Sequence, residues 1–346
     1  EEIEIQDSEE LYEKLVLEID KGQEPLRIDK FLMARVEGAT RNKIQQAIDN
    51  EMVLVNDKPI KSNYKVKPAD KIVVFDNKNP ESTDIIPENI PLNIVFEDDD
   101  VLVINKVPNM VVHPGVGNHS GTLLNGVAYH LLQQNPTLSE DELPRYGMVH
   151  RIDKNTTGLI VLAKNAAAAS HLAKQFFNHT VSRKYMALVW GDVKEDAGTI
   201  TGNIARHEQF RKMFTVYPEA EKGKHAITHY TVLERMNYVT LVECVLETGR
   251  THQIRVHMKY MGHTLFNDWE YGGDRILKGT IYTKYKQFVD NCFELCPRCA
   301  LHAKTLGFVH PRTNEEMFFE APIPNDMLSA IEKWRKYVGN RPLVED

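Results

Sequence analysis

The loop at residues 150–159, with the sequence HRIDKNTTGL, combines a carboxylate, two cations and several short hydroxyl and amide side chains. An apolar run at 159–163 follows directly and predicts a buried strand. A carboxylate at the mouth of a core strand can attack a carbon atom or move a proton if its charge is controlled. Asp153 is therefore a candidate catalytic residue. An ordinary turn is the simpler interpretation of this loop alone, because Asp, Asn and Thr side chains bond to nearby backbone groups.

Three further segments carry equally particular groups and follow the loop in a fixed order. They read SRKY at 182–185, GRTHQIRVH at 249–257, and LHA at 301–303, which is followed by LGF at 306–308. Upstream, residues 90–106 predict strands, and VHPG at 112–115 predicts a loop. This ordered set resembles the RluA/RluD-type pseudouridine synthases, which isomerise uridine in structured RNA. The likeness covers about residues 26–324.

The resemblance implies a reaction that breaks the C1′–N1 bond of uridine, rotates the uracil and rejoins it through C5. Nothing is oxidised and no group is gained, so no cofactor is expected, and the chain has no P-loop or dinucleotide fingerprint. We expect Asp153 to act either as the nucleophile at C1′ or as the base that starts elimination across the ribose. The sequence leaves both routes open.

The resemblance also assigns a partner to Asp153, because the family's Asp-pairing arginine falls at Arg255. A bidentate guanidinium would oppose the rise in pKa that burial causes and would orient the carboxylate. We expect Thr251 to cap a helix, which places Arg255 about one turn inside it. Arg250 and His252 then remain for phosphate contact or for the scaffold.

Two apolar contacts to the uracil follow from the same resemblance. Tyr185, in a strand predicted at 184–190, corresponds to the ring that stacks on the everted base and helps to remove the C5 proton. A phenol is a poor base unless its pKa is perturbed, so stacking is the firmer part of this expectation. Ile254 is expected to add a second apolar contact. Most tyrosines in such strands are core residues, which is the alternative for Tyr185.

The everted uridine leaves a gap in the RNA, and this unstacking costs roughly a few kcal/mol. We expect the planar guanidinium of Arg151 to fill the gap, because guanidinium groups stack well on bases. His150, Thr157 and Leu159 belong to the same motif and are expected among the substrate-binding residues.

Residues 26–75 form a basic segment with ten Lys or Arg residues against six acidic ones. Apolar spacing predicts a helix over 28–36, Thr40 is the expected N-cap of a second helix, and 53–56 and 71–74 predict strands. This pattern resembles the S4 RNA-binding module. An ordinary helix pair with solvated cations is the alternative. The cations expected to contact RNA are Arg27, Lys30, Arg35, Arg41 and Lys43.

The flanks of this segment are acidic and account for the net charge of −7. Residues 1–25 hold ten acidic and two basic residues, and residues 76–100 hold eight and one. Because an electrostatic footprint is local, acidic flanks do not exclude an RNA partner. Within the first flank, Leu11, Leu15 and Ile19 predict a short amphipathic helical turn.

We therefore predict an acidic extension (1–25), an S4-like RNA-binding domain (26–75), a linker (76–90) and a pseudouridine synthase catalytic domain (91–346). In the last, helices are expected at 122–132, 165–177 and within 323–337, and strands at 101–104, 184–190, 226–234 and 239–246. The fold class is α+β: a large mixed, mostly antiparallel sheet with flanking helices, joined to a small N-terminal α/β S4-like domain.

The four cysteines are too few for a disulfide framework, which favours a reducing compartment. Cys292, Cys296 and Cys299 have the spacing of iron–sulfur ligands, and His302 would complete a zinc site. Their place near the C-terminus does not match radical enzymes, so we expect no metal. No apolar run approaches the roughly 20 residues of a membrane helix. We expect a cytoplasmic monomer with no membrane contact.

The predicted activity is RNA pseudouridine synthesis, with large-subunit ribosomal RNA or pre-ribosomal particles as the expected partner, because the S4-like segment and the entry loop resemble that subgroup. A non-catalytic RNA-binding protein is one alternative, although Asp153, Tyr185 and Arg255 are all present. A glycosidase for free nucleosides is another, although it would not need the segment at 26–75.

Overall fold

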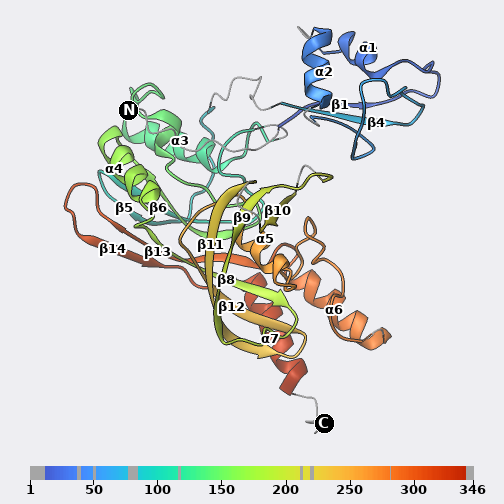
Figure 1. Ribbon diagram of the computed structural model, residues 1–346. Coiled ribbons are helices and arrows are strands. Elements are labelled where there is room, and N and C mark those ends of the chain that lie inside the picture. The colour runs from blue at the N-terminus through green and yellow to red at the C-terminus, as the bar shows by residue number, and fades with distance from the viewer. Residues whose placement is uncertain are drawn as a thin grey trace.

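A computed structural model describes residues 12–36, 40–49, 52–76, 85–115, 118–210, 213–218, 222–280 and 282–339. Figure 1 shows a small unit, drawn in blue and carrying α1 and α2, and a larger body built around a long sheet. Both agree with the predicted fold class: a small antiparallel sheet with two helices precedes a large mixed sheet with flanking helices.

The small unit is a four-stranded antiparallel sheet in the order β1-β4-β2-β3, covered by two helices. Its apolar core includes Ile28, Phe31, Ile44 and Ile72. Both helices and both predicted strands are confirmed. The elements are β1 (Tyr12–Glu18), α1 (Ile28–Met33), α2 (Arg41–Asp49), β2 (Val53–Val55), β3 (Lys58–Pro59) and β4 (Lys71–Asp76).

Strand β1 contradicts the helical turn predicted around residues 11–19. Its partner is β4, with Leu17 opposite Ile72. Leu15, Leu17 and Ile19 alternate with exposed residues and pack on the core of the small unit. Their spacing of two residues is that of a strand, and it dominates over the four-residue spacing from which the helix was predicted.

The larger body contains a ten-stranded sheet in the order β10-β9-β11-β12-β8-β13-β7-β6-β5, with β14 paired to β13. One pair is parallel, β13 with β7, and the others are antiparallel. The strands are β5 (Ile94–Glu97), β6 (Val101–Lys106), β7 (Thr157–Ala163), β8 (Ser182–Trp190), β9 (Ala197–Arg206), β10 (Phe214–Tyr217), β11 (Lys224–Met236), β12 (Val239–Leu246), β13 (Leu301–Val309) and β14 (Glu316–Glu320).

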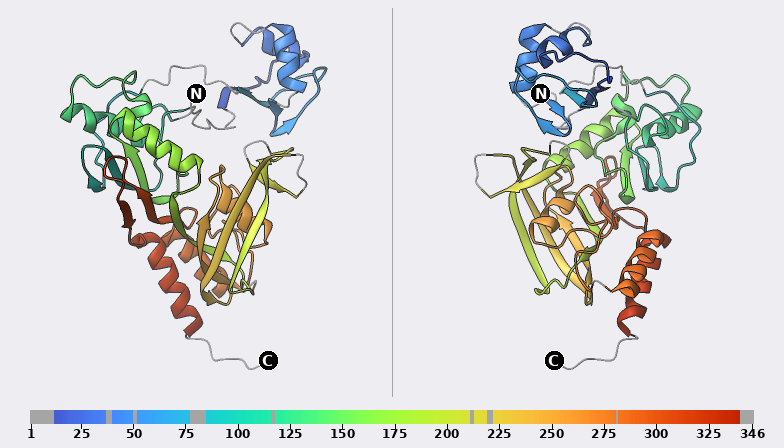
Figure 2. Two further views of the ribbon diagram at one scale, coloured as in Figure 1. Left: turned by 60° about the vertical axis from the view of Figure 1, so that its left-hand side comes forward. Right: turned by 90° about the vertical axis from the view of Figure 1, so that its right-hand side faces the viewer.

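Helices flank this sheet, and Figure 2 shows α7 at the end of the molecule opposite α1 and α2. Thr122 and Asn125 form a capping box at the start of α3, which explains why that helix was predictable. Helix α6 was not predicted. No described helix is long and apolar enough to cross a membrane. The helices are α3 (Leu123–Gln134), η1 (Pro144–Gly147), α4 (Ala166–Phe177), α5 (Gln253–Tyr260), α6 (Thr283–Leu295) and α7 (Asn325–Gly339).

Buried histidines make the fold sensitive to mild acid. Burial lowers the pKa of His257 and that of His302 to about 4, and both side chains are almost fully buried. In the unfolded chain each takes up a proton near pH 6.5. Below that pH the unfolded state binds more protons, so the free energy of unfolding falls as the pH falls towards 4.

We expect each of these histidines to lower the free energy of unfolding by up to about 1.4 kcal/mol per pH unit between pH 6.5 and 5. Urea denaturation at pH 7.5, 6.5, 5.75 and 5.0 measures this dependence, in a range above the titration of ordinary carboxylates. The His302→Asn variant should show a shallower slope than the wild type. Equal slopes would show that His302 is not the group that titrates.

Candidate active site

A cavity of about 440 Å³ opens where three of the sequence motifs meet. Its walls come from the loop before β7, the end of α4, the start of β8 and the start of α5. Asp153, Tyr185 and Arg255 all line it, although they lie far apart in the sequence. The convergence of these motifs on one cavity makes it the candidate active site.

Asp153 and Arg255 form a hydrogen-bonded ion pair in this cavity. Arg255 Nη1 donates to Asp153 Oδ2 at 3.1 Å. The guanidinium is 7% exposed, whereas the carboxylate is 25% exposed and so remains reachable. Burial acts to raise the pKa of Asp153, but the charges of His252 and Arg255 and the Arg255 hydrogen bond outweigh it, so this pKa lies below its ordinary value. Asp153 is therefore a carboxylate at neutral pH.

The guanidinium of Arg255 also binds two other carboxylates. Nε and Nη2 form a bidentate pair with Asp268, at 2.7 and 2.8 Å, and Nη2 also contacts Glu270. The sequence predicted a bidentate pair with Asp153, which is wrong in this detail. The Nε–Nη2 edge faces Asp268, so Nη1 alone reaches Asp153. Asp268 thus fixes the guanidinium, and the guanidinium fixes Asp153.

The start of α5 differs from the prediction that Thr251 caps it. The N-cap is His252, whose φ of 54° lies in the left-handed region, and its side chain makes no capping hydrogen bond. Instead, Gln253 Oε1 accepts from Arg250 N at 2.9 Å and from Thr248 Oγ1 at 2.8 Å. This left-handed turn brings His252 Nε2 to 4.0 Å from Asp153 Oδ2.

Tyr185 and Ile254 supply apolar wall to the same cavity. Both are buried, at 7% and 4% exposure, and Tyr185 lies opposite Cys244 of β12 and Ala303 of β13. Burial raises the pKa of the Tyr185 phenol. The ring is thus held in place by its neighbours. Its hydroxyl loses a proton less readily than the hydroxyl of an exposed tyrosine does, so less phenolate is present to act as a base.

Three other predicted site residues also line the cavity. His150 stacks on Phe176 with ring centroids 4.3 Å apart, and its Nε2 accepts from Val161 N at 3.0 Å. Burial lowers the pKa of His150 to about 3, so the ring is neutral. Arg151 is exposed at the wall, and Arg250 Nε donates to His225 O at 3.0 Å.

Comparison with known proteins decides the family. Residues 100–260 match the family described as RNA pseudouridylate synthase, and residues 26–72 match the S4 domain. The chain is 47% identical to an uncharacterized RNA pseudouridine synthase of Chlorobaculum parvum, over 93% of this chain and 98% of that one. The chain belongs to the RNA pseudouridine synthases.

Two further similarities agree with this assignment. The ribosomal large subunit pseudouridine synthase D of Neisseria meningitidis is 41% identical over 90% of this chain and 80% of that one. The solved structure of human RNA pseudouridylate synthase domain containing 4 superposes with a TM-score of 0.54 at 21% identity, over 70% of this chain and 93% of that one. At that identity the structure supports the fold alone.

Two residues predicted to bind the substrate of the synthase lie elsewhere. Thr157 is buried and its Oγ1 is hydrogen-bonded to His302 Nδ1 at 2.9 Å, and Leu159 packs in an apolar cluster with Val103 and Val161. Neither lines the cavity. Because β7 begins at Thr157, both residues belong to the sheet and not to the loop that lines the cavity. They lie behind the loop, in the sheet that supports it.

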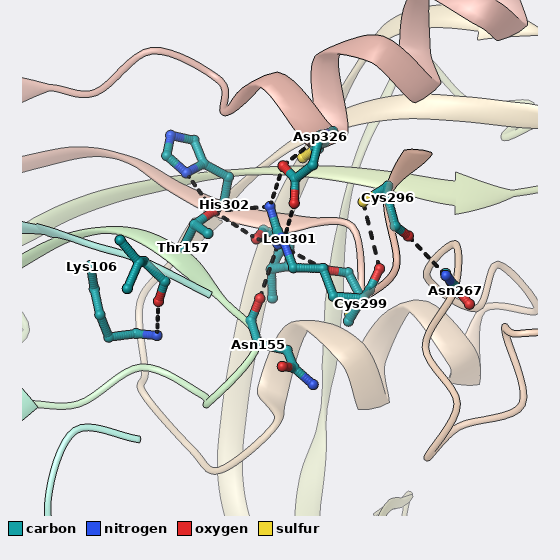
Figure 3. Close-up of polar contacts among 12 residues, drawn as sticks. Lys106, Asn155, Thr157, Asn267, Cys296, Cys299, Leu301, His302 and Asp326 are labelled. Carbon is teal, nitrogen blue, oxygen red and sulfur yellow. Dashed lines mark hydrogen bonds and ion pairs between the residues drawn. The ribbon is translucent and has the colours of Figure 1, made fainter. Parts of the chain in front are cut away.

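Sequence reasoning missed several residues of the synthase site. Arg183 lies within the SRKY motif, lines the cavity and is 8% exposed, with its guanidinium 5.5 Å from the Phe176 ring centroid. Lys106, labelled in Figure 3, is 1% exposed, and its Nζ donates to the backbone carbonyls of Val107, Met110 and Lys154. The signal in the sequence that could have identified Lys106 is its place as a lysine at the end of an apolar strand.

The cysteines near the C-terminus do not converge on one point. Cys296 Sγ donates to Arg298 O, and Cys299 Sγ donates to Asp268 Oδ2 at 3.5 Å. Burial raises the pKa of Cys292 and that of Cys296 to about 12, and both side chains pack in an apolar cluster. These side chains serve as core residues.

The cations of the S4 unit are partly engaged within the unit itself. Arg27 pairs with the buried Asp29 at 2.8 Å, and Arg41 lies 3.4 Å from the same carboxylate. Arg35 packs over the Phe31 ring at 3.8 Å, while Lys30 is exposed. Arg27 and Arg41 remain 39% and 55% exposed, so pairing leaves them accessible. The side chain of Lys43 lies outside the described residues.

Proposed function

We propose that this pseudouridine synthase modifies uridines of large-subunit ribosomal RNA, with Asp153 acting at C1′ of the everted nucleotide. The likeness to ribosomal large subunit pseudouridine synthase D over most of the chain supports the target. The S4 domain supports a structured RNA as the partner. The predicted boundaries of the linker and of the catalytic domain also stay part of this proposal, and we extend the S4-like unit back to β1, which is part of its sheet.

The pairing of Asp153 with Arg255 is the observation that carries the catalytic role. The carboxylate is ionised and accessible, and a buried cation holds it in the same cavity as Tyr185 and Ile254. Attack at C1′ and abstraction of a ribose proton both require a carboxylate in this state. Both routes therefore remain open, and the geometry supports either.

Tyr185 and Ile254 are proposed to hold the uracil while it rotates, because a ring face and an aliphatic side chain contact a base without fixing its orientation. A Tyr185→Phe enzyme keeps the ring and loses the hydroxyl. If the hydroxyl assists C5 deprotonation, we expect this variant to release the C5 proton about 100-fold more slowly, with unchanged RNA affinity. Single-turnover tritium release measures this, and a wild-type rate would limit Tyr185 to stacking.

Arg151 is proposed to occupy the place that the uridine leaves in the RNA. It is exposed at the cavity wall, next to the loop that carries Asp153. We expect Arg151→Ala to weaken binding of the RNA about tenfold, because one stacking partner is worth about 1–3 kcal/mol. Filter binding and single-turnover rates test this. An Arg151→Ala enzyme with normal affinity and normal turnover would contradict it.

Incubation with RNA that carries tritium at C5 of uridine tests the function as a whole. A pseudouridine synthase releases tritium without releasing free uracil. A binding protein releases neither, and a glycosidase releases uracil. Mapping pseudouridine in ribosomal RNA from cells that lack the protein tests the target. Retention of every large-subunit site would contradict the proposed substrate.

A further inference from the structure

We propose that Arg298 is a positioning residue that holds the loop carrying Asp153 in its reactive place. This inference rests on the proposed role of Asp153 at C1′. Arg298 does not line the cavity. It lies between α6 and β13, and its side chain is 4% exposed.

The guanidinium of Arg298 donates to main-chain and side-chain oxygens of the active-site loop, of its own segment and of α7. Nη1 donates to the carbonyls of Asn155 at 2.9 Å and of Leu301 at 3.1 Å, and Nη2 donates to Thr157 Oγ1 at 3.3 Å. Figure 3 shows Asn155, Thr157 and Leu301 converging on this point. Asn155 lies two residues after Asp153, so this bond fixes the backbone directly behind the carboxylate.

A carboxylate of the last helix orients the guanidinium. Asp326 in the first turn of α7 accepts from Arg298 Nε at 2.7 Å and from Nη2 at 3.0 Å. Asp326 Oδ1 also accepts from Met327 N at 2.7 Å, which ties the carboxylate to the helix. A chain of hydrogen bonds thus runs from α7 through Asp326 and Arg298 to the loop.

A second buried basic side chain holds the neighbouring carbonyl of the same loop. Lys106 Nζ donates to Lys154 O at 3.1 Å and to Met110 O at 2.9 Å. The two peptide oxygens that follow Asp153 are therefore held by two basic side chains from distant parts of the chain. Since a displacement of about 1 Å at a reacting group can slow a reaction about 100-fold, this support bears directly on turnover.

The shape of the side chain matters as much as its charge. A guanidinium presents five N–H donors in a fixed plane, which matches a bidentate carboxylate on one edge and several carbonyls on the other. A lysine ammonium has three donors at one point and cannot span the same oxygens. Arg298→Lys therefore keeps the charge while releasing part of the loop.

The test compares Arg298→Lys and Asp326→Asn with a matched control on the same helix. Arg335 of α7 pairs with Glu234 through the Nε–Nη2 edge of its guanidinium at 2.7–3.0 Å, but this pair is solvent-exposed and does not touch the loop. The Arg335→Gln variant thus removes an arginine–carboxylate pair from α7 and leaves the loop unchanged. Single-turnover rates, RNA Kd and Tm are measured for all three.

We expect Arg298→Lys to lower the single-turnover rate at saturating RNA tenfold or more, corrected for the folded fraction, while Kd changes less than threefold. Asp326→Asn should lower the rate threefold or more, and Arg335→Gln should leave it unchanged. If Arg298→Lys does not fold, Asp326→Asn decides.

Rates within threefold of wild type in the folded variants, or a parallel loss of affinity, would overturn the role of Arg298. Loss of rate in Arg335→Gln would do the same. If Asp153→Asn is inactive while these variants keep their rate, only this inference fails. If Asp153→Asn is active, the proposed function fails first.

Discussion

An Asp153→Asn enzyme is expected to form pseudouridine at least about a thousandfold more slowly than the wild type. The amide has nearly the size of the carboxylate, but it is neither a nucleophile nor a base at neutral pH. Because Asp153 is already an anion in the wild type, the substitution removes a charge that Arg255 stabilises. Single-turnover tritium release from C5-labelled RNA measures the loss.

RNA affinity serves as the control for Asp153→Asn. The S4 unit and the cationic walls of the cavity remain, so Kd should stay within about threefold of wild type. Unchanged Tm would show that the neutral variant still accommodates Arg255. A rate within tenfold of wild type would contradict the assignment of Asp153 to the chemical step.

Arg255→Met is expected to destabilise the protein by about 3–5 kcal/mol, because it leaves buried carboxylates without their cation. Asp268 is 1% exposed and loses both of its guanidinium bonds, and Glu270 and Asp153 lose one contact each. Urea denaturation measures the change. A loss below 1 kcal/mol would contradict this account of the carboxylate cluster.

Arg255→Lys separates charge from geometry. Arg255 helps to hold the pKa of Asp153 below its ordinary value, so weakening that contact should raise this pKa. The acidic limb of the rate–pH profile, where Asp153 takes up a proton, should therefore move to higher pH. Glu270→Gln is the matched control, because it removes a competing carboxylate and should not move the limb upward. An unchanged limb in Arg255→Lys would contradict the coupling.

Asp153 and Arg255 could be predicted from the sequence because they lie in motifs whose order along the chain is similar to that of one family. Asp153 and Arg255 are separated by 102 residues, and no local pattern brings them together. Periodicity alone located the strands β6, β8, β11 and β12, because their apolar residues are either continuous or alternate with polar ones. It also located α3 and α4, whose capping residues Thr122 and Asn165 are in place.

What the sequence missed depends on contacts between distant segments. The bidentate partner of Arg255 is Asp268, whose carboxylate reaches it from the loop after α5. Nothing in the local pattern around Lys106 or Arg298 shows that their side chains hold loop carbonyls 48 and 143 residues away. The helical turn predicted in place of β1 was wrong because this segment pairs with β4. That pairing, and not the local spacing of apolar residues, decides between strand and helix.

The charge of the Asp153 carboxyl is most directly measured by carbon NMR of aspartate-labelled protein, with Asp153→Asn identifying the signal. If Arg255 and its neighbours stabilise the anion, that signal stays at the ionised position from pH 7.5 down to pH 4.5. A signal that titrates near pH 6 or above would show that burial, and not the neighbouring cations, controls the pKa of this carboxyl. That result would contradict the account.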